Sequence, residues 1–303
     1  STIHSADAVT PLRLLLRRTQ VRQAEVMGID FDKKTVTVVQ SFRRIPIDIP
    51  YDELVIALGM SVDLGRFPGL PEHALTMKNL ADAHRLRTHV ISCLEAADVT
   101  TDTDVKQQLL TFLVAGAGFT GVETVSEINE LIHRALKYYP NIKQDEIHVY
   151  LVEYANRILP TFPSDLADYA TKRMQMHGIV VKTGVGTKAA TATAVELTDG
   201  TVIPTRTIVA TIGNGPNPLV ASLGLEMHWG RIRTDRYMRV PGHDHVWAVG
   251  DAADIPLVDH PGEDPAHYAP QTAQFAVREG QQLADNIIAQ ANDKKLKPFG
   301  YTS

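Results

Sequence analysis

The sequence predicts a protein of the α/β class, and three observations support that prediction. Continuous apolar segments, such as Leu54–Leu58 and Leu109–Ala115, are typical of strands buried on both faces of a parallel sheet. Stretches with the apolar spacing of amphipathic helices follow such segments. Two apolar segments end in glycine, at Gly116 and Gly250, where a strand would turn toward a helix. The 303 residues are enough for two domains.

The elements of the first third of the chain follow from local signals. Thr10 and Pro11 are a helix cap and a first-turn proline, so a short helix is predicted there. Alternating apolar residues over 36–38 and 45–49 predict antiparallel strands, and the apolar run 54–58 predicts a buried strand. Glycines and prolines mark 61–78 as a linker. Asn79 is a suitable cap for a helix over 80–97, and the polar stretch 98–107 predicts a loop.

From Leu109 onward, strands and helices alternate. The apolar run 109–115 predicts a strand, 116–121 a glycine-rich turn, and the spacing of apolar residues over 121–138 a helix. The same signals predict strands over 147–152, 179–181, 208–210 and 246–249, helices over 167–177 and 271–290, and a hairpin over 195–203. This alternation is typical of parallel sheets joined by helical crossovers.

The composition describes a globular chain and excludes several classes of function. Hydrophobic residues make up 44% and charged residues 21%, the balance of soluble globular proteins, and the formal net charge is −5. Nucleic-acid binders usually carry a basic face, so we expect no nucleic-acid partner. The short basic run of Arg13, Arg17, Arg18 and Arg22 is an exception, which we interpret as a solvated helix face. No apolar run reaches the roughly 18 residues of a transmembrane helix.

Cysteine and histidine offer little chemistry. The single cysteine, Cys93, excludes a disulfide framework and a Cys-x-x-Cys redox pair within the chain. His243, His245, His260 and His267 are loosely grouped, but the first two lie in a predicted turn, so we expect no metal site.

The segment after the strand 109–115 carries the clearest functional signal. Gly116, Gly118 and Gly121 fit the pattern G-x-G-x-x-G between a buried strand and an amphipathic helix. The first glycine allows a tight turn, the second lets the backbone approach a diphosphate, and the third lets helix and strand pack closely. Free amides and the positive end of the helix dipole would hold the phosphates. The segment therefore predicts a dinucleotide site.

Acidic residues near this turn suggest the kind of dinucleotide. Glu153 ends the next strand, where a carboxylate can accept hydrogen bonds from a ribose 2′-OH and repel a 2′-phosphate. This position favours NADH over NADPH, although the spacing from Gly116 is 37 residues (153 − 116), against the usual separation of about 20. Glu123 lies in the first helical turn, either as a helix-stabilising acid or as a contact for nicotinamide, and position alone does not decide between them.

A second set of segments indicates a flavin site. The strand 246–249 ends in Gly250 and Asp251, whose carboxylate could bind the ribityl hydroxyls of a flavin. Tyr51–Gly59 is a companion strand that also ends in glycine. The helix that begins near residue 271 presents a positive end, which could stabilise an anionic reduced flavin.

These segments together resemble the two-dinucleotide flavoproteins known as pyridine nucleotide-disulfide oxidoreductases, and most closely type II NADH dehydrogenases, which are NADH:quinone oxidoreductases. Six segments carry the resemblance: Tyr51–Gly59, Gly116–Glu123, Leu151–Glu153, Ile208–Gly213, Val246–Ala252 and Ala273–Gln274. The resemblance implies an NADH site formed by Gly116, Gly118, Thr120, Gly121, Glu153 and Gly213. It also implies an FAD site formed by Gly59, Gly250, Asp251 and Ala273. Glu123 and Gln274 are implied as the residues beside nicotinamide and quinone.

The resemblance also implies an architecture. We expect a glutathione-reductase-like fold with two Rossmann-like domains, in which the NADH domain, 79–233, is inserted into an FAD domain formed by 1–78 and 234–303. The family's first FAD-binding βαβ unit would precede residue 1, and its membrane-docking helices would follow a segment similar to 298–301. The chain is therefore expected to be a soluble part of a longer protein, truncated at both ends.

The implied activity is hydride transfer from NADH to FAD and electron transfer from FAD to a quinone. The implied parent protein lies peripherally on the cytoplasmic face of a membrane, within a respiratory chain, and is compatible with a homodimer. Two alternatives stay open. The chain could be a non-catalytic NADH-binding module or an inert fragment, or another flavin-dependent NAD(P)H oxidoreductase. A disulfide reductase of the same fold would need a cysteine pair before residue 1.

Overall fold

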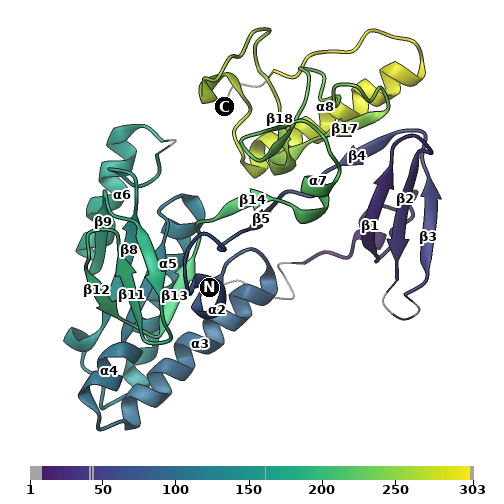
Figure 1. Cartoon of the computed structure of the whole chain (residues 1–303). Helices are drawn as coiled ribbons and strands as arrows, with labels where there is room; N and C mark the ends of the chain where they lie inside the picture. The colour runs from purple at the N-terminus through teal and green to yellow at the C-terminus, as the bar shows by residue number, and fades with distance from the viewer. Residues whose placement is uncertain (1–8, 41, 43, 161, 301–303) are drawn as a thin grey trace. The chain divides into compact units, whose positions relative to one another are not determined.

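The chain forms two compact units, and the computed structural model describes residues 9–40, 42, 44–160 and 162–300 (Figure 1). The inserted unit spans Val62–Gly213, and the flanking unit consists of Pro11–Ser61 and the residues from Asn214 onward. The α/β class is thereby confirmed, as is the insertion of one unit into the other. The boundaries of the inserted unit lie at Val62 and Gly213, whereas the sequence suggested 79 and 233. Tyr301, in the segment expected to precede a membrane-docking tail, lies outside the described residues.

The inserted unit is built around a parallel sheet. Its strands are β6 (Leu75–Thr76), β7 (Thr111–Ala115), β8 (His148–Glu153), β9 (Ile179–Thr183), β10 (Thr187–Ala190), β11 (Ala194–Leu197), β12 (Val202–Pro204) and β13 (Thr207–Ala210). Its helices are α2 (Leu70–His73), α3 (Leu80–Val99), α4 (Thr103–Leu109), α5 (Phe119–Ala135) and α6 (Ser164–Met176), with 3-10 turns at Leu136–Tyr138 and Gln144–Glu146. The five-stranded sheet has the order β6-β13-β7-β8-β9, and every neighbouring pair is parallel.

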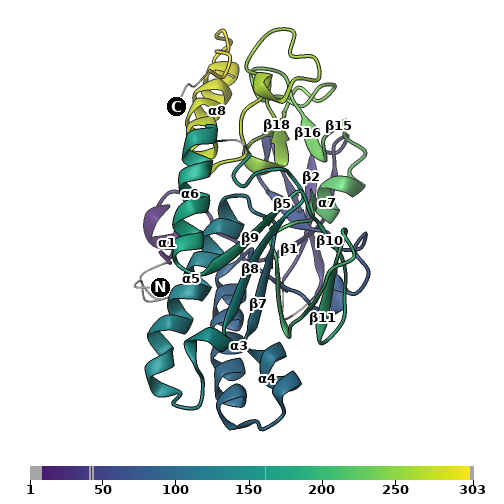
Figure 2. The same cartoon turned by 90° about the vertical axis from the view of Figure 1, so that its left-hand side faces the viewer.

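Two hydrophobic cores cover the two faces of this sheet. Phe112 and Val114 of β7 point into a core shared with α3, α5 and α6. The alternate residues Leu113 and Ala115 point into a core shared with the antiparallel meander β10-β11-β12. Figure 2 shows the helices on one side of the sheet and the meander on the other. All five residues of β7 are buried, as the continuous apolar run predicted.

The flanking unit is assembled from two distant parts of the chain. Its strands are β1 (Glu25–Asp30), β2 (Thr35–Val39), β3 (Pro46–Pro50), β4 (Leu54–Ile56), β14 (Asn214–Pro216), β15 (Met227–His228), β16 (Arg231–Arg233), β17 (Val246–Ala248) and β18 (Ala253–Asp254), and β5 (Met60–Val62) leads into the inserted unit. Its helices are α1 (Leu12–Leu15), α7 (Pro218–Ser222) and α8 (Ala273–Ala291), with 3-10 turns at Gly250–Ala252 and Pro265–His267. The strands β4 and β17 are parallel neighbours although about 190 residues separate them in sequence.

Several local expectations were wrong. The N-cap of α1 is Pro11 rather than Thr10, and Leu109, expected in a strand, ends α4. The polar stretch 98–107 contains the start of α4, because the Asp102 carboxylate accepts hydrogen bonds from the amides of Asp104 and Val105, both at 3.0 Å, and so caps a helix. The linker 61–78 contains α2 and the edge strand β6, which pairs with β13. None of the helices in the described part of the chain combines the length and apolar character that a membrane crossing requires.

Candidate dinucleotide site

The glycine-rich turn connects β7 to α5 at the carboxyl edge of the parallel sheet. Gly116 has a left-handed φ of +98°, a conformation that favours glycine. Its amide donates a hydrogen bond of 2.8 Å to the carbonyl of Val152. Gly118 is the residue that precedes α5, and the helix begins at Phe119. The strand, turn and helix therefore occur in the order that the motif predicted.

The second and third glycines of the motif lie in different surroundings. A Cβ on Gly121 would lie 1.9 Å from the carbonyl oxygen of Gly116 and 2.9 Å from the hydroxyl of Thr211. Gly121 thus lets α5 pack directly against the turn. A Cβ on Gly118 would meet no protein atom within 4 Å. Gly118 is exposed, and the space in front of it is open to a ligand.

Glu153 lies at the end of β8, and its carboxylate reaches back to the turn. One carboxylate oxygen accepts a hydrogen bond of 2.6 Å from the amide of Ala117, and the other accepts one of 2.8 Å from the amide of Ala155. The two amides fix the direction of the side chain. Each carboxylate oxygen retains a lone pair for a further donor, such as a sugar hydroxyl. The long sequence separation from Gly116 is absorbed by α5 and the following 3-10 turns.

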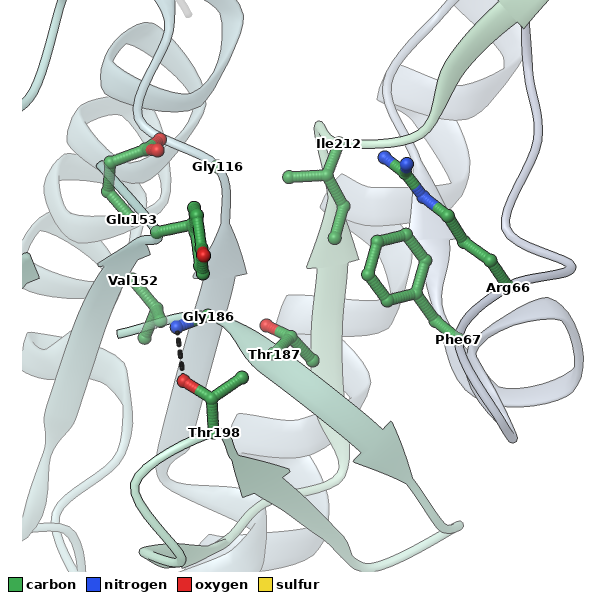
Figure 3. Close-up of a pocket in the computed structure, with 10 residues that line it drawn as sticks. Arg66, Phe67, Gly116, Val152, Glu153, Gly186, Thr187, Thr198 and Ile212 are labelled. Carbon is green, nitrogen blue, oxygen red and sulfur yellow. Dashed lines mark hydrogen bonds between the residues drawn. The ribbon is translucent and has the colours of Figure 1, made fainter. Parts of the chain in front are cut away.

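A cavity of about 380 Å³ opens between this turn and the meander (Figure 3). Cavities of that size are typical of small-molecule sites. Its walls are largely apolar. The lining residues are Arg66, Phe67, Gly116, Val152, Glu153, Tyr154, Gly186, Thr187, Thr198 and Ile212.

One polar group that lines this cavity lacks a partner. The Thr187 residue is only 6% exposed, and its hydroxyl oxygen is buried without a hydrogen bond. The neighbouring Thr198 hydroxyl, in contrast, accepts a hydrogen bond of 2.9 Å from the amide of Gly186. Buried polar groups are nearly always paired, so the Thr187 hydroxyl indicates that a polar group of a ligand or a water completes the cavity.

The remaining residues predicted for this site lie around the cavity without lining it. Gly213 is buried with φ of +79°, and a Cβ there would lie 2.4 Å from the carbonyl oxygen of Asp63. This close approach alone requires glycine at 213. Thr120 and Glu123 are exposed in the first turns of α5, and neither lines the cavity.

The flanking unit brings together the residues predicted for a flavin. Gly59 and Gly250 follow the parallel strands β4 and β17 and have left-handed φ values of +62° and +66°. The Gln271 side chain, just before α8, donates a hydrogen bond of 3.2 Å to the carbonyl of Asp251. Ala273 is the first residue of α8 and is exposed. Gly59, Gly250, Asp251 and the start of α8 therefore lie near one sheet edge.

Sequence reasoning missed a buried carboxyl group beside these residues. Glu279 of α8 is 2% exposed, and its side chain accepts a hydrogen bond of 2.7 Å from the amide of Gly250. Burial raises the pKa of this carboxyl above its ordinary value. The sequence contained one signal of this burial. Glu279 lies three residues after Ala276 and four before Leu283, a spacing that places it on the same helix face as the predicted apolar stripe.

The other candidate groups have structural partners. The Glu53 carboxylate accepts hydrogen bonds from Trp247 at 2.7 Å and Gln290 at 3.1 Å and pairs with His245 at 2.9 Å, which joins β4, β17 and α8. Cys93 is buried, and burial raises the pKa of its thiol. Within the residues that the structure describes, no three His, Cys, Asp or Glu side chains gather as metal ligands.

The fold and the two glycine-lined sheet edges define a class of flavin- and nicotinamide-binding oxidoreductases. The chain belongs to the pyridine nucleotide-disulphide oxidoreductase family, whose model matches residues 10–280.

Two curated relatives illustrate the subgroup. A probable NADH dehydrogenase of Dictyostelium discoideum is 30% identical over 283 residues, covering 92% of this chain and 61% of the relative. An external alternative NADH-ubiquinone oxidoreductase of Yarrowia lipolytica mitochondria is 31% identical over 317 residues, covering 96% of this chain and 52% of the relative. The chain thus spans about half to three-fifths of the length of these relatives.

Two solved structures share the fold. NDH2 from Plasmodium falciparum, solved in complex with NADH, has a TM-score of 0.83 at 18% identity and covers 93% of this chain and 72% of that protein. A ferredoxin reductase from Rhodopseudomonas palustris has a TM-score of 0.72 at 20% identity and covers 97% of this chain and 64% of that protein.

Proposed function

We propose that the inserted unit binds NADH and that the protein containing this chain is an FAD-dependent NADH:quinone oxidoreductase. The observation that carries the proposal is the arrangement at the carboxyl edge of the parallel sheet. Gly116 and Glu153 line one cavity, the Glu153 carboxylate accepts a hydrogen bond from the amide of Ala117 in the glycine turn, and α5 begins two residues further on, at Phe119. The names of the relatives support the choice of NADH and quinone as substrates.

In the proposed complex, the diphosphate lies in the open space before Gly118. The amides of Phe119, Thr120 and Gly121 are in the first turn of α5 and have no carbonyl partner within the helix. They would donate hydrogen bonds to phosphate oxygens, assisted by roughly half a positive charge at the helix end. Glu153 would accept the ribose hydroxyls. A 2′-phosphate would instead meet its negative charge, so NADH is favoured over NADPH.

The flanking unit is proposed to hold FAD through Gly59, Gly250, Asp251 and Ala273. Gly59 leaves room for a ligand beside the end of β4, because a Cβ there would meet no protein atom within 4 Å. A flavin bound there supplies the chemistry that accepts hydride from NADH and passes electrons to a quinone.

Glu123 is proposed to lie near nicotinamide and Gln274 near flavin and quinone, by resemblance to the family. We accordingly assign NADH binding to the inserted unit, Val62–Gly213, and FAD binding to the flanking unit. Peripheral membrane association on the cytoplasmic face and a homodimer are further proposals for the whole protein.

The purified chain tests both halves of the proposal. Titration with NADH, followed by the change in nicotinamide fluorescence, should saturate at lower concentration than titration with NADPH. Flavin absorbance that stays with the protein after gel filtration would support the FAD assignment. Saturable NADH binding without flavin retention would favour the alternative of an NADH-binding module. Absence of NADH binding would overturn the proposal for the inserted unit.

A further inference from the structure

The loop between β5 and α2 contributes two residues to the cavity that the sequence did not single out. Arg66 and Phe67 line the wall opposite Glu153 (Figure 3). The Arg66 guanidinium lies 4.9 Å from the centroid of the Phe67 ring, within the range of a cation–π contact. Among the described residues that line the cavity, Arg66 carries the only positive charge and Glu153 the only negative charge.

The backbone of this loop is fixed at both ends. The Asp63 amide donates a hydrogen bond of 2.6 Å to the carbonyl of Gly213, at the end of β13. The Ala190 amide of the meander donates one of 2.9 Å to the carbonyl of Pro68. Gly69 packs against the same strand so tightly that a Cβ would lie 1.9 Å from the carbonyl oxygen of Ala190. Arg66 is therefore presented to the cavity by a preorganised segment.

The charges of the cavity match the charges of a dinucleotide. The negative charge of NADH lies on its diphosphate, while the adenosine ribose offers neutral hydroxyls. A carboxylate suits the hydroxyls, and a guanidinium suits phosphate oxygens because it can donate two parallel hydrogen bonds. Glu153 and Arg66 lie on opposite walls, with the turn at Gly116 at the same cavity.

We propose that Arg66 is a binding residue for the dinucleotide diphosphate, held in position by Phe67 and by the fixed loop. This assignment rests on the proposed NADH function of the inserted unit. The diphosphate is bound from two sides, by the amides of α5 and by the guanidinium. The buried hydroxyl of Thr187, which lines the same cavity without a hydrogen bond, is a further polar group that a ligand there can meet.

The test compares Arg66→Gln with a matched control, Arg206→Gln. Arg206 is exposed in the same unit, precedes β13 and bonds the Gln108 side chain, so it lies at the opposite edge of the sheet. Dissociation constants are measured for NADH, NADPH, ADP-ribose and adenosine. Arg66→Gln should raise the dissociation constants of NADH and ADP-ribose about tenfold, equivalent to about 1.4 kcal/mol of binding free energy. It should leave adenosine binding and the melting temperature unchanged, and the difference should shrink at high salt. The control should change none of these quantities.

Three results would overturn the assignment. Unchanged NADH affinity in Arg66→Gln would exclude a contact with the diphosphate. An equal loss of affinity for adenosine and NADH would indicate that Arg66 only shapes the cavity. A greater loss for NADPH than for NADH would indicate a contact with the 2′-phosphate. Absence of NADH binding by the unsubstituted chain is a separate outcome, because it overturns the proposed function itself and this assignment with it.

Discussion

Two glycines of one turn should respond to substitution in opposite ways. Gly118→Val adds a side chain to space in which no protein atom lies within 4 Å of the new Cβ, and the backbone there, φ −71° and ψ −173°, suits any residue. Gly121→Ala adds a Cβ only 1.9 Å from the carbonyl oxygen of Gly116. The first change fills the proposed place of the diphosphate, and the second forces the helix away from the turn.

The structure sets the size of each effect. The new Cβ at 121 must move about 1.5 Å to reach an ordinary contact of 3.4 Å, and the opposing atom is backbone. Overpacking of this kind costs about 3 kcal/mol, which lowers the Tm of a unit the size of Val62–Gly213 by roughly 6–12 °C. Valine is a poor residue before a helix, so Gly118→Val should cost about 1 kcal/mol or less. In the same variant, loss of two charge-assisted hydrogen bonds to phosphate, about 1.5–3 kcal/mol each, should lower the affinity for NADH more than 100-fold.

The assay measures thermal unfolding and NADH titration for both variants beside the unsubstituted chain. We expect Gly118→Val to lose NADH binding with a Tm lowered by about 4 °C at most. Gly121→Ala should lose much of its stability. Retained NADH affinity in Gly118→Val would refute the assignment of the turn, and a large loss of stability in that variant would show that the space is not free.

Three further predictions concern other residues. Glu153→Arg should weaken NADH binding and strengthen NADPH binding relative to NADH binding. An unchanged NADH-to-NADPH ratio of dissociation constants would count against the ribose contact. Gln274→Ala in the full-length protein should slow quinone reduction more than flavin reduction in stopped-flow measurements, and equal slowing would argue against a role on the quinone side. His228 bonds the buried Asp254 and, at 3.1 Å, the exposed Glu263. Burial alone would lower its pKa, but the two carboxylates outweigh burial and raise it. Its protonated form thus stabilises the fold fully below about pH 6.5, the unfolded pKa, and this stability is lost as pH rises through the higher folded pKa. Urea midpoints should fall over that range in the unsubstituted chain and less in His228→Gln; equal pH slopes would contradict this.

The parts of the site that local sequence specifies were predictable. Gly116, Gly118 and Gly121 occur between an apolar strand and an amphipathic helix, so their spacing indicated both the turn and its direction. Glu153 could be located because it ends the next strand, and adjacent parallel strands end at the same sheet edge. The companion strands that end in Gly59 and Gly250 were likewise recognised, and the structure pairs them as parallel neighbours.

The parts that depend on tertiary contact were not predictable. Arg66 lies in a glycine- and proline-rich stretch that resembles any linker. Tertiary bonds of its neighbours, from Asp63 to Gly213 and from Ala190 to Pro68, bring it to the cavity. Glu279 lies on an apolar stripe where a carboxyl group is unexpected, and its partner is a backbone amide about 30 residues earlier. Sequence periodicity describes faces of single elements and contains no information about which loop meets which strand end.

A crystal structure of the chain with NADH bound would test the proposed dinucleotide site most directly. We expect diphosphate oxygens within hydrogen-bond distance of the amides at the start of α5 and adenosine ribose hydroxyls on the Glu153 carboxylate. A dinucleotide bound elsewhere, or bound there with Glu153 directed away from the ribose, would contradict the proposed site.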